Sequence, residues 1–496
     1  MKNQKIIFIL LALTVGFIFS LHNLIPWWTA RQQGIIYTPF NNGDENIYAS
    51  QVVAVVQGQL FDGRNLSSLP FIGPFLLASF TWLFGSVETT FILADFFLPA
   101  IIFLLLFQLS WQFKVSRELA LVGSLASLFG YQLLTKINPV AWFQPMFFNF
   151  NRLIPPQLTF IFLLLFLISL YRRSILAGFW AGLLAYVYFY HWSAALLILA
   201  IFCLLTKSKK LLAGLLLGLI ISLPYFYQSF SAPIEQQIRF GRLEGRFLEP
   251  LTTIRYVFLI ILIYFSSLSA LVKKFWWSVF FAAIGLMNVQ LVTGFTIAPG
   301  HWPSSTFEPL VPLLLVIVFG RLIEKYWRIF TGLILAYALI NQSLISWQWQ
   351  SMYRITPREQ ELITFINQQA GNPIVLTLDK RLNFYLPVLS KAKLYLPYGS
   401  YSSFSREELW QRFNCAMALS HLSQAEIEAT LTDTQIIGHL FDLTYNQGLT
   451  VFSFGKRQLP EELKAWSREQ LAQEPVCPFP ADYIILKDGS LYAAHN

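Results

Sequence analysis

Apolar runs separated by short polar breaks fill residues 1–349, whereas residues 350–496 mix polar and apolar positions as a soluble domain does. A helix that crosses a bilayer needs roughly 20 consecutive apolar residues. Runs of this kind lie at 6–25, 89–112, 119–136, 157–171, 174–190, 193–206, 210–226, 251–271, 275–297, 309–323 and 328–346. The pattern predicts a transmembrane domain over 1–349 and a separate C-terminal domain over 350–496.

Basic residues in the breaks predict the orientation. Lys2 and Lys5 precede the first run. The other basic groups follow every second run: Lys114 and Arg117; Arg172 and Arg173; Lys207, Lys209 and Lys210; Lys273 and Lys274; Arg321, Lys325 and Arg328. Because cytoplasmic loops carry an excess of Lys and Arg, these breaks are placed inside. The pattern requires that the apolar stretch 71–86 does not cross, and its prolines and glycines favour an interfacial or re-entrant segment. We therefore expect eleven spans, a cytoplasmic N-terminus and an extracytoplasmic C-terminal domain.

Helical and strand patterns alternate in the C-terminal domain. We predict helices at 356–371, 405–422 and 460–473, and strands at 373–379, 393–399 and 481–489. This alternation argues for an α/β domain. The predicted fold is thus a polytopic α-helical membrane protein of about eleven transmembrane helices, with interfacial helices in its first outer loop and a C-terminal α/β domain. No nucleophile elbow, phosphate loop or zinc spacing occurs in that domain, so we assign no chemistry to it.

Composition supports the membrane class. The chain is 55% hydrophobic and 12% charged, against about 45–50% and about 25% in soluble domains. This excludes an ordinary cytosolic enzyme, a disordered chain and a disulfide scaffold. The net charge of +9 does not indicate a nucleic-acid partner, because Lys and Arg orient the loops of membrane proteins. We expect an integral membrane protein, in the plasma or inner membrane if the source is bacterial.

The three cysteines form no metal-ligand spacing. Cys415 and Cys477 both lie in the domain expected outside the cytoplasm, where oxidation permits a disulfide. Cys203 lies within a predicted span, where we expect it to stay reduced.

The first outer loop, 26–70, carries a pair of carboxylates. Tyr48, Val52 and Val55 or Val56 recur at helical spacing, which predicts an amphipathic helix at the membrane surface with Asp44 and Glu45 at its N-terminus. Two interpretations stay open. Asp is a favoured N-cap, and acidic groups suit the positive end of a helix dipole. A carboxylate pair at the bilayer boundary also makes a general base or a site for a divalent cation, Mg²⁺ or Mn²⁺.

The order of these features resembles a known family. The pair Asp44-Glu45, followed by Tyr48, comes just after the first span, and a second interfacial segment ending in Leu-Phe-Gly (83–85) precedes a span that ends in basic residues. This layout is similar to the GT-C superfamily of integral membrane glycosyltransferases. Its closest resemblance is to the branch of dolichyl-phosphate-mannose protein mannosyltransferases and aminoarabinose lipid A transferases. Where many members carry Pro-Asp at the start of the fourth span, this chain has Pro156-Gln157.

The resemblance implies an activity and roles for the site. A hexosyl- or pentosyltransferase of this kind moves a sugar from a polyprenyl-phosphate donor to a lipid, glycan or protein acceptor on the extracytoplasmic face. Asp44 corresponds to the base that acts on the acceptor, and Glu45 supports it or helps to hold a metal. Tyr48 is a candidate substrate contact.

Arginines in the outer loops are candidates for the donor phosphate, since a guanidinium matches phosphate oxygens in a bidentate manner. Arg152 is alone in an aromatic loop, where the alternative is an interfacial residue that snorkels. Arg239, Arg242 and Arg246 are spaced by three and four, as on one face of a helix, and the alternative for them is a solvated charged helix.

Two His-Trp pairs lie at the outer ends of predicted spans. His191 and His301, with Glu308 nearby, are candidates for substrate or metal contact, and the alternative is an interfacial aromatic belt.

Two other functions remain open. A transporter or flippase of lipid-linked glycans predicts charged residues inside the spans, and a non-catalytic membrane scaffold would present the C-terminal domain.

Overall fold

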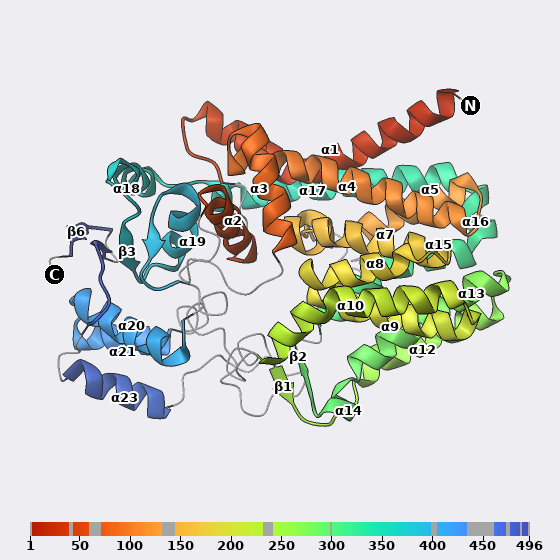
Figure 1. Ribbon diagram of the computed structural model, residues 1–496. Helices are drawn as coiled ribbons and strands as arrows, with labels where there is room; N and C mark the ends of the chain where they lie inside the picture. Colours follow the sequence, from red (N-terminus) through yellow and green to blue (C-terminus); the bar gives the residue numbers. More distant parts are fainter. Residues whose placement is uncertain are drawn as a thin grey trace.

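The computed structural model describes residues 2–38, 43–58, 71–130, 144–231, 242–297, 300–397, 404–433, 461–472, 477–486 and 489–494. A bundle of helices makes up the larger part, and the residues that follow it form a smaller part at one end (Figure 1). We call the end of the bundle that faces the C-terminal part the near end, and the opposite end the far end. The N-terminus lies at the far end, away from the C-terminus (Figure 1).

Among the residues that the structure describes, six helices are long and apolar enough to cross a membrane, judged by length and composition. They are α1 (Lys2–Gln32, apolar from Ile6), α4 (Val87–Gln112), α9 (Phe189–Thr206), α10 (Lys209–Ser231), α13 (Ala270–Met287) with α14 (Gln290–Thr293), and α17 (Trp327–Trp349). The prediction of a helical membrane protein is confirmed.

Shorter helices complete the bundle. They are α2 (Gly43–Val56), α3 (Ile72–Phe84), α5 (Arg117–Leu125) with η1 (Ala126–Gly130), η3 (Asn149–Asn151), η4 (Leu153–Leu158) with α7 (Thr159–Tyr171), α8 (Leu176–Leu183) with η5 (Leu184–Tyr186), α12 (Pro250–Phe265), η6 (Trp302–Phe307), η7 (Glu308–Leu310), α15 (Val311–Val318) and α16 (Gly320–Lys325). A helix thus occupies each predicted span, the third one through Gly130, where the described stretch ends. The count of eleven crossings stays a prediction.

The bundle is held by one large apolar cluster and by close helix contacts. Side chains of α1, α4, α7, α9, α13 and α15 share the cluster, which includes the fully buried Trp276. Helices α8 and α10 approach most closely where two glycines meet. A methyl group placed on Gly178 would lie 1.7 Å from the carbonyl oxygen of Gly214, so this crossing requires residues without a side chain.

The C-terminal part contains a four-stranded sheet in the order β4-β3-β5-β6. Its elements are η8 (Gln350–Tyr353), α18 (Pro357–Gln368), β3 (Ile374–Thr377), α19 (Lys380–Leu389), β4 (Lys393–Leu394), α20 (Arg406–Leu419), α21 (Gln424–Thr432), α23 (Glu461–Ala472), β5 (Tyr483–Ile485) and β6 (Leu491–Ala493). Strand β3 is parallel to both neighbours, with Val375 opposite Leu394 and Tyr483, and β6 is antiparallel to β5. The α/β pattern is therefore as predicted, although α19, α21 and β6 were not among the predicted elements.

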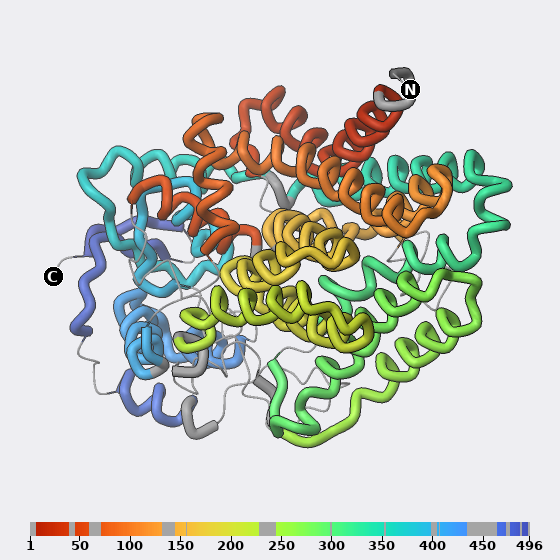
Figure 2. Tube along the Cα trace, turned by 45° about the vertical axis from the view of Figure 1, so that its right-hand side comes forward, coloured from red at the N-terminus to blue at the C-terminus, as the bar shows by residue number. Residues whose placement is uncertain are grey.

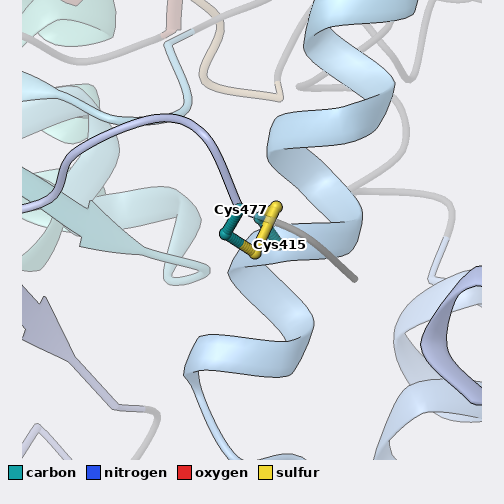
Figure 3. The surroundings of a disulfide bond; sticks show 2 residues. All are labelled: Cys415 and Cys477. Atoms are coloured by element: carbon teal, nitrogen blue, oxygen red, sulfur yellow. A yellow bond between two sulfur atoms is a disulfide. The ribbon is translucent and has the colours of Figure 1, made fainter. Parts of the chain in front are cut away.

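A disulfide links α20 to the segment that leads into β5. Cys415 and Cys477 are bonded, with their Cα atoms 5.5 Å apart (Figure 3). The expected pairing is confirmed, and Cys203 is free and buried.

The C-terminal part packs on the bundle through α19 and through the segment after α1. Val388 of α19 shares an apolar cluster with Ala49 and Val52 of α2. The backbone N–H of Ile355 donates to the carbonyl of Ile36 at 3.0 Å. The segment after α1 and helix α2 lie beside α18 and α19 in two views (Figures 1 and 2). The two parts therefore meet at the helix that carries the predicted carboxylates.

Candidate functional site

Helix α2 carries the predicted carboxylate pair in its first turn. The helix begins at Gly43, so Asp44 and Glu45 lie inside it rather than before it. The Asp44 side chain lies outside the described residues. Glu45 is 4% exposed, and its Oε1 accepts a hydrogen bond from the backbone N–H of Leu153 at 3.0 Å. The Glu45 carboxylate is therefore held at the helix N-terminus by a group from η4.

The interpretation of α2 as an amphipathic surface helix is wrong for its polar side. Ser50 and Gln51 are buried, together with the apolar residues of the helix. The reason is tertiary, because α3 and η4 cover one side of α2 and α19 of the C-terminal part covers another. Tyr48 is half-buried.

The turn that holds Glu45 has an unusual backbone. Residues Leu153–Leu158 form a π-helix, in which the N–H of Gln157 donates to the carbonyl of Arg152 at 3.2 Å. Pro156 has no N–H and therefore cannot donate to the carbonyl of Arg152, as the residue at this position of an α-helix would, so Gln157 donates instead. Short π-helical turns recur at functional sites. Arg152 directly precedes Leu153, so the fold brings this candidate phosphate ligand next to the Glu45 contact.

The expectation that Arg239, Arg242 and Arg246 share one helical face is wrong for the part that the structure describes. Residues Arg242–Glu244 form β1, which pairs antiparallel with β2 (Phe295–Ile297). Gly245 has φ +127°, a conformation that ends any helical repeat. Arg246 is exposed, and its Nη1 donates to the carbonyl of Leu291 at 3.2 Å. Arg239 and the side chain of Arg242 lie outside the described residues.

The predicted His and Glu contacts have separate environments. His191 is fully buried, with Nε2 3.2 Å from the Thr159 hydroxyl and Nδ1 2.9 Å from the Thr306 hydroxyl. His301 is exposed and stacks on the ring of Tyr190, with centroids 4.7 Å apart. Glu308 forms an ion pair with Arg255 of α12.

Tyr188 contacts both His191 and His301. The Tyr188 hydroxyl is 2.9 Å from His301 Nδ1, and its ring centroid is 4.9 Å from that of His191. The near end of α9 is therefore lined with aromatic and imidazole rings.

Sequence reasoning missed a cluster of buried polar side chains beneath the site. Asp95 of α4 is 3% exposed and accepts hydrogen bonds from Asn23 Nδ2 and, at 2.7 Å, from Gln157 Nε2. His22 Nε2 lies 3.6 Å from the same carboxylate. A carboxylate within an apolar run is a functional signal in a membrane protein, and it was available in the sequence. The partners of Asp95 come from distant segments and could not be identified from the sequence.

The described side chains bear on the site expected for Mg²⁺ or Mn²⁺. Within the described residues, no group of three or more His, Cys, Asp or Glu side chains could hold a metal ion. The candidate pair is Asp44 and Glu45, and the described member of the pair already accepts a backbone hydrogen bond. A divalent cation therefore stays a prediction, and no catalytic step below depends on it.

Comparison with known proteins gives no relative: neither a family model nor a curated protein matches the chain.

Proposed function

We propose that this protein is a membrane glycosyltransferase that moves a sugar from a polyprenyl-phosphate donor to an acceptor on the extracytoplasmic face. The observation that carries the proposal is the contact between Glu45 and Leu153. It places a carboxylate-bearing helix N-terminus beside Arg152 at one end of a membrane domain. The layout that resembles the GT-C superfamily agrees with this activity.

The proposed reaction needs a base and a group that stabilises the departing phosphate. Asp44 takes the proton of an acceptor hydroxyl as the hydroxyl oxygen bonds to the anomeric carbon of the sugar. The bond from this carbon to the phosphate oxygen breaks, and the polyprenyl phosphate leaves with the electron pair. Arg152 binds the phosphate oxygens, on which negative charge develops. Glu45 holds its place through Leu153 and supports Asp44.

We propose eleven spans with the near end outside the cytoplasm. The disulfide supports this orientation, because such bonds persist in oxidising compartments. The loops at Lys114, Arg173 and Lys207 support it too, since these basic residues follow α4, α7 and α9 and cytoplasmic loops favour Lys and Arg. A reporter that is active only outside the cytoplasm should be active when fused after Asn496. Activity of a cytoplasm-specific reporter at the same position would contradict the orientation.

We expect Arg152→Ala to weaken donor binding by about 10–100-fold, the range for hydrogen bonds to a charged group. Arg152→Lys should recover part of this loss, because the charge remains and the planar fork does not. The measurement is binding of a fluorescent polyprenyl-phosphate sugar to the full chain in nanodiscs.

Arg117→Ala is the matched control for this prediction. Arg117 begins α5 at the far end of the bundle, and its guanidinium lies over the ring of Trp111 in α4. Donor binding should not change in this variant. Equal binding by the parent and Arg152→Ala would remove Arg152 from the donor site.

A flippase for lipid-linked glycans is the second candidate function, and the buried Asp95 and His22 within spans favour it. A transport path, however, needs polar groups that exchange partners along it. Asp95 is instead bonded to Gln157 and Asn23 inside the packed bundle. The glycosyltransferase explains these contacts together with the carboxylates of α2.

A further inference from the structure

The buried carboxylate of Asp95 is a junction between three segments at the near end. It accepts hydrogen bonds from Asn23 of α1 and from Gln157 of η4. The side-chain oxygen of Asn23 in turn accepts from the Tyr37 hydroxyl, and Tyr37 forms an isolated β-bridge with Arg354 at the start of the C-terminal part. Asp95 therefore connects α4 with the turn under the candidate site and with the segment that joins the two parts.

Gln157 links Asp95 to the turn 150–157 by hydrogen bonds. Its Nε2 donates both to Asp95 Oδ1 at 2.7 Å and to the carbonyl of Phe150 at 2.6 Å. The orientation of a Gln amide group, with its oxygen and its NH₂ at opposite ends, is set by the hydrogen-bond partners on each side. Asp95 Oδ1 accepts from this NH₂ group on one side and the Phe150 carbonyl accepts from it on the other, so the contact with Asp95 holds the NH₂ end of Gln157 in place against Phe150.

The same turn fixes Glu45. Phe150 lies in η3 and Leu153 opens η4, and the N–H of Leu153 donates to Glu45 Oε1 at 3.0 Å. A continuous series of hydrogen bonds and short backbone links thus runs from Asp95 through Gln157 and Phe150 to Glu45.

We propose that Asp95 is a positioning residue: through Gln157 it holds the turn 150–157 in the shape that presents Leu153 to Glu45 at the head of α2. The consequence for catalysis rests on the proposed function, whereas the structural coupling does not. Burying a carboxylate carries a large desolvation cost, and well-packed apolar residues often stabilise such a place better. The retained carboxylate is consistent with a role in setting the geometry.

Asp95→Asn is the first test. Asn keeps the volume but offers one acceptor oxygen where Asp offers two, so Gln157 and Asn23 cannot both be satisfied as in the parent. We expect transfer to fall by on the order of 10²-fold, as when a catalytic group is displaced by about 1 Å. Hydrogen exchange of the full chain in nanodiscs should speed up in peptides covering 43–49 and 148–158.

The double variant Asp95→Asn with Gln157→Glu distinguishes a positioning role of Asp95 from a contribution to stability alone. The amide introduced at 95 donates to the carboxylate introduced at 157 and accepts from Asn23, so the melting temperature should recover toward that of the parent. The carboxylate at 157 has no N–H for the Phe150 carbonyl. We therefore expect exchange in 43–49 to stay fast and transfer to stay low. Recovery of transfer together with the melting temperature would overturn the proposal.

Leu106→Ala is the matched control, because Leu106 is a fully buried residue further along the same helix. It should lower the melting temperature without changing exchange in 43–49. If Asp95→Asn does not fold, Gln157→Met removes the donor to Phe150 while Asp95 keeps Asn23, and the same measurements apply. Unchanged exchange in 43–49 in a folded variant of Asp95 or Gln157 also overturns the proposal. A parent protein that transfers no sugar refutes the proposed function, and the exchange result still decides the coupling.

Discussion

Asp44→Asn should lower sugar transfer by about 10²–10⁴-fold, the usual contribution of a general base. The amide cannot accept the proton of the acceptor hydroxyl. The fold should persist, because Asp44 lies in the first turn of α2 and its charge contributes only about 0.3–1 kcal/mol through the helix dipole. The measurement is transfer from a radiolabelled polyprenyl-phosphate sugar by the purified full chain, together with its melting temperature.

Glu45→Gln is the matched comparison on the neighbouring residue. The introduced amide oxygen still accepts the hydrogen bond from Leu153, so the position of the helix end should be kept. If Glu45 supports Asp44 through this contact, the loss of transfer is much smaller than for Asp44→Asn. Losses of similar size in the two variants, together with inhibition by a chelator, would show that both carboxylates hold a metal. An active Asp44→Asn protein would require another base, with Glu308 the next candidate at the near end.

Removing the disulfide should destabilise the C-terminal part by about 4 kcal/mol, as chain entropy predicts for a bond that closes a sequence separation of 62 residues. Cys415 is fully buried in the apolar cluster of this part, so Ser would add an unpaired hydroxyl. The suitable change is therefore Cys415→Ala with Cys477→Ala. The measurement is the denaturant midpoint of protease resistance for peptides of 357–394.

Cys203→Ala controls for the loss of a cysteine elsewhere in the chain. Cys203 is the free, buried cysteine of α9, and its replacement should leave the midpoint of the C-terminal part unchanged. A reductant should shift the parent midpoint and leave that of Cys415→Ala with Cys477→Ala where it is. A parent midpoint that does not respond to the reductant would contradict the prediction.

The sequence by itself determined the helices of the bundle, because the apolar composition of a segment shows that its surroundings are lipid or protein rather than water. Apolar runs at 6–25, 89–112 and 193–206 have few ways to satisfy their backbone in a bilayer other than as helices. Local signals in the C-terminal part predicted α18, α20 and α23 and strands β3, β4 and β5, but not α19, α21 or β6. The helix predicted at 356–371 contains α18, and the structure adds a reciprocal cap between Thr356 and Glu359 at its start.

Local pattern failed where a distant segment supplied the partner. The spacing of Arg242 and Arg246 fits a helix, yet β2 offers backbone partners some fifty residues away and Gly245 allows the turn that this pairing needs. The pattern of α2 predicts a solvent-exposed polar face, but its polar residue Gln51 is buried in the folded protein. Burial is a property of the whole assembly and has no local signature.

The same distinction between local sequence and tertiary structure applies to the candidate site. The sequence by itself determined which residue types stand at the head of α2 and at Arg152, and therefore which chemistry is available there. Only the tertiary structure decided that Leu153 binds Glu45 and that Asp95, Gln157 and Asn23 meet beneath them. The physical reason is that a hydrogen bond depends on position and direction within a few tenths of an ångström. Such geometry arises only when helices from distant parts of the chain pack together.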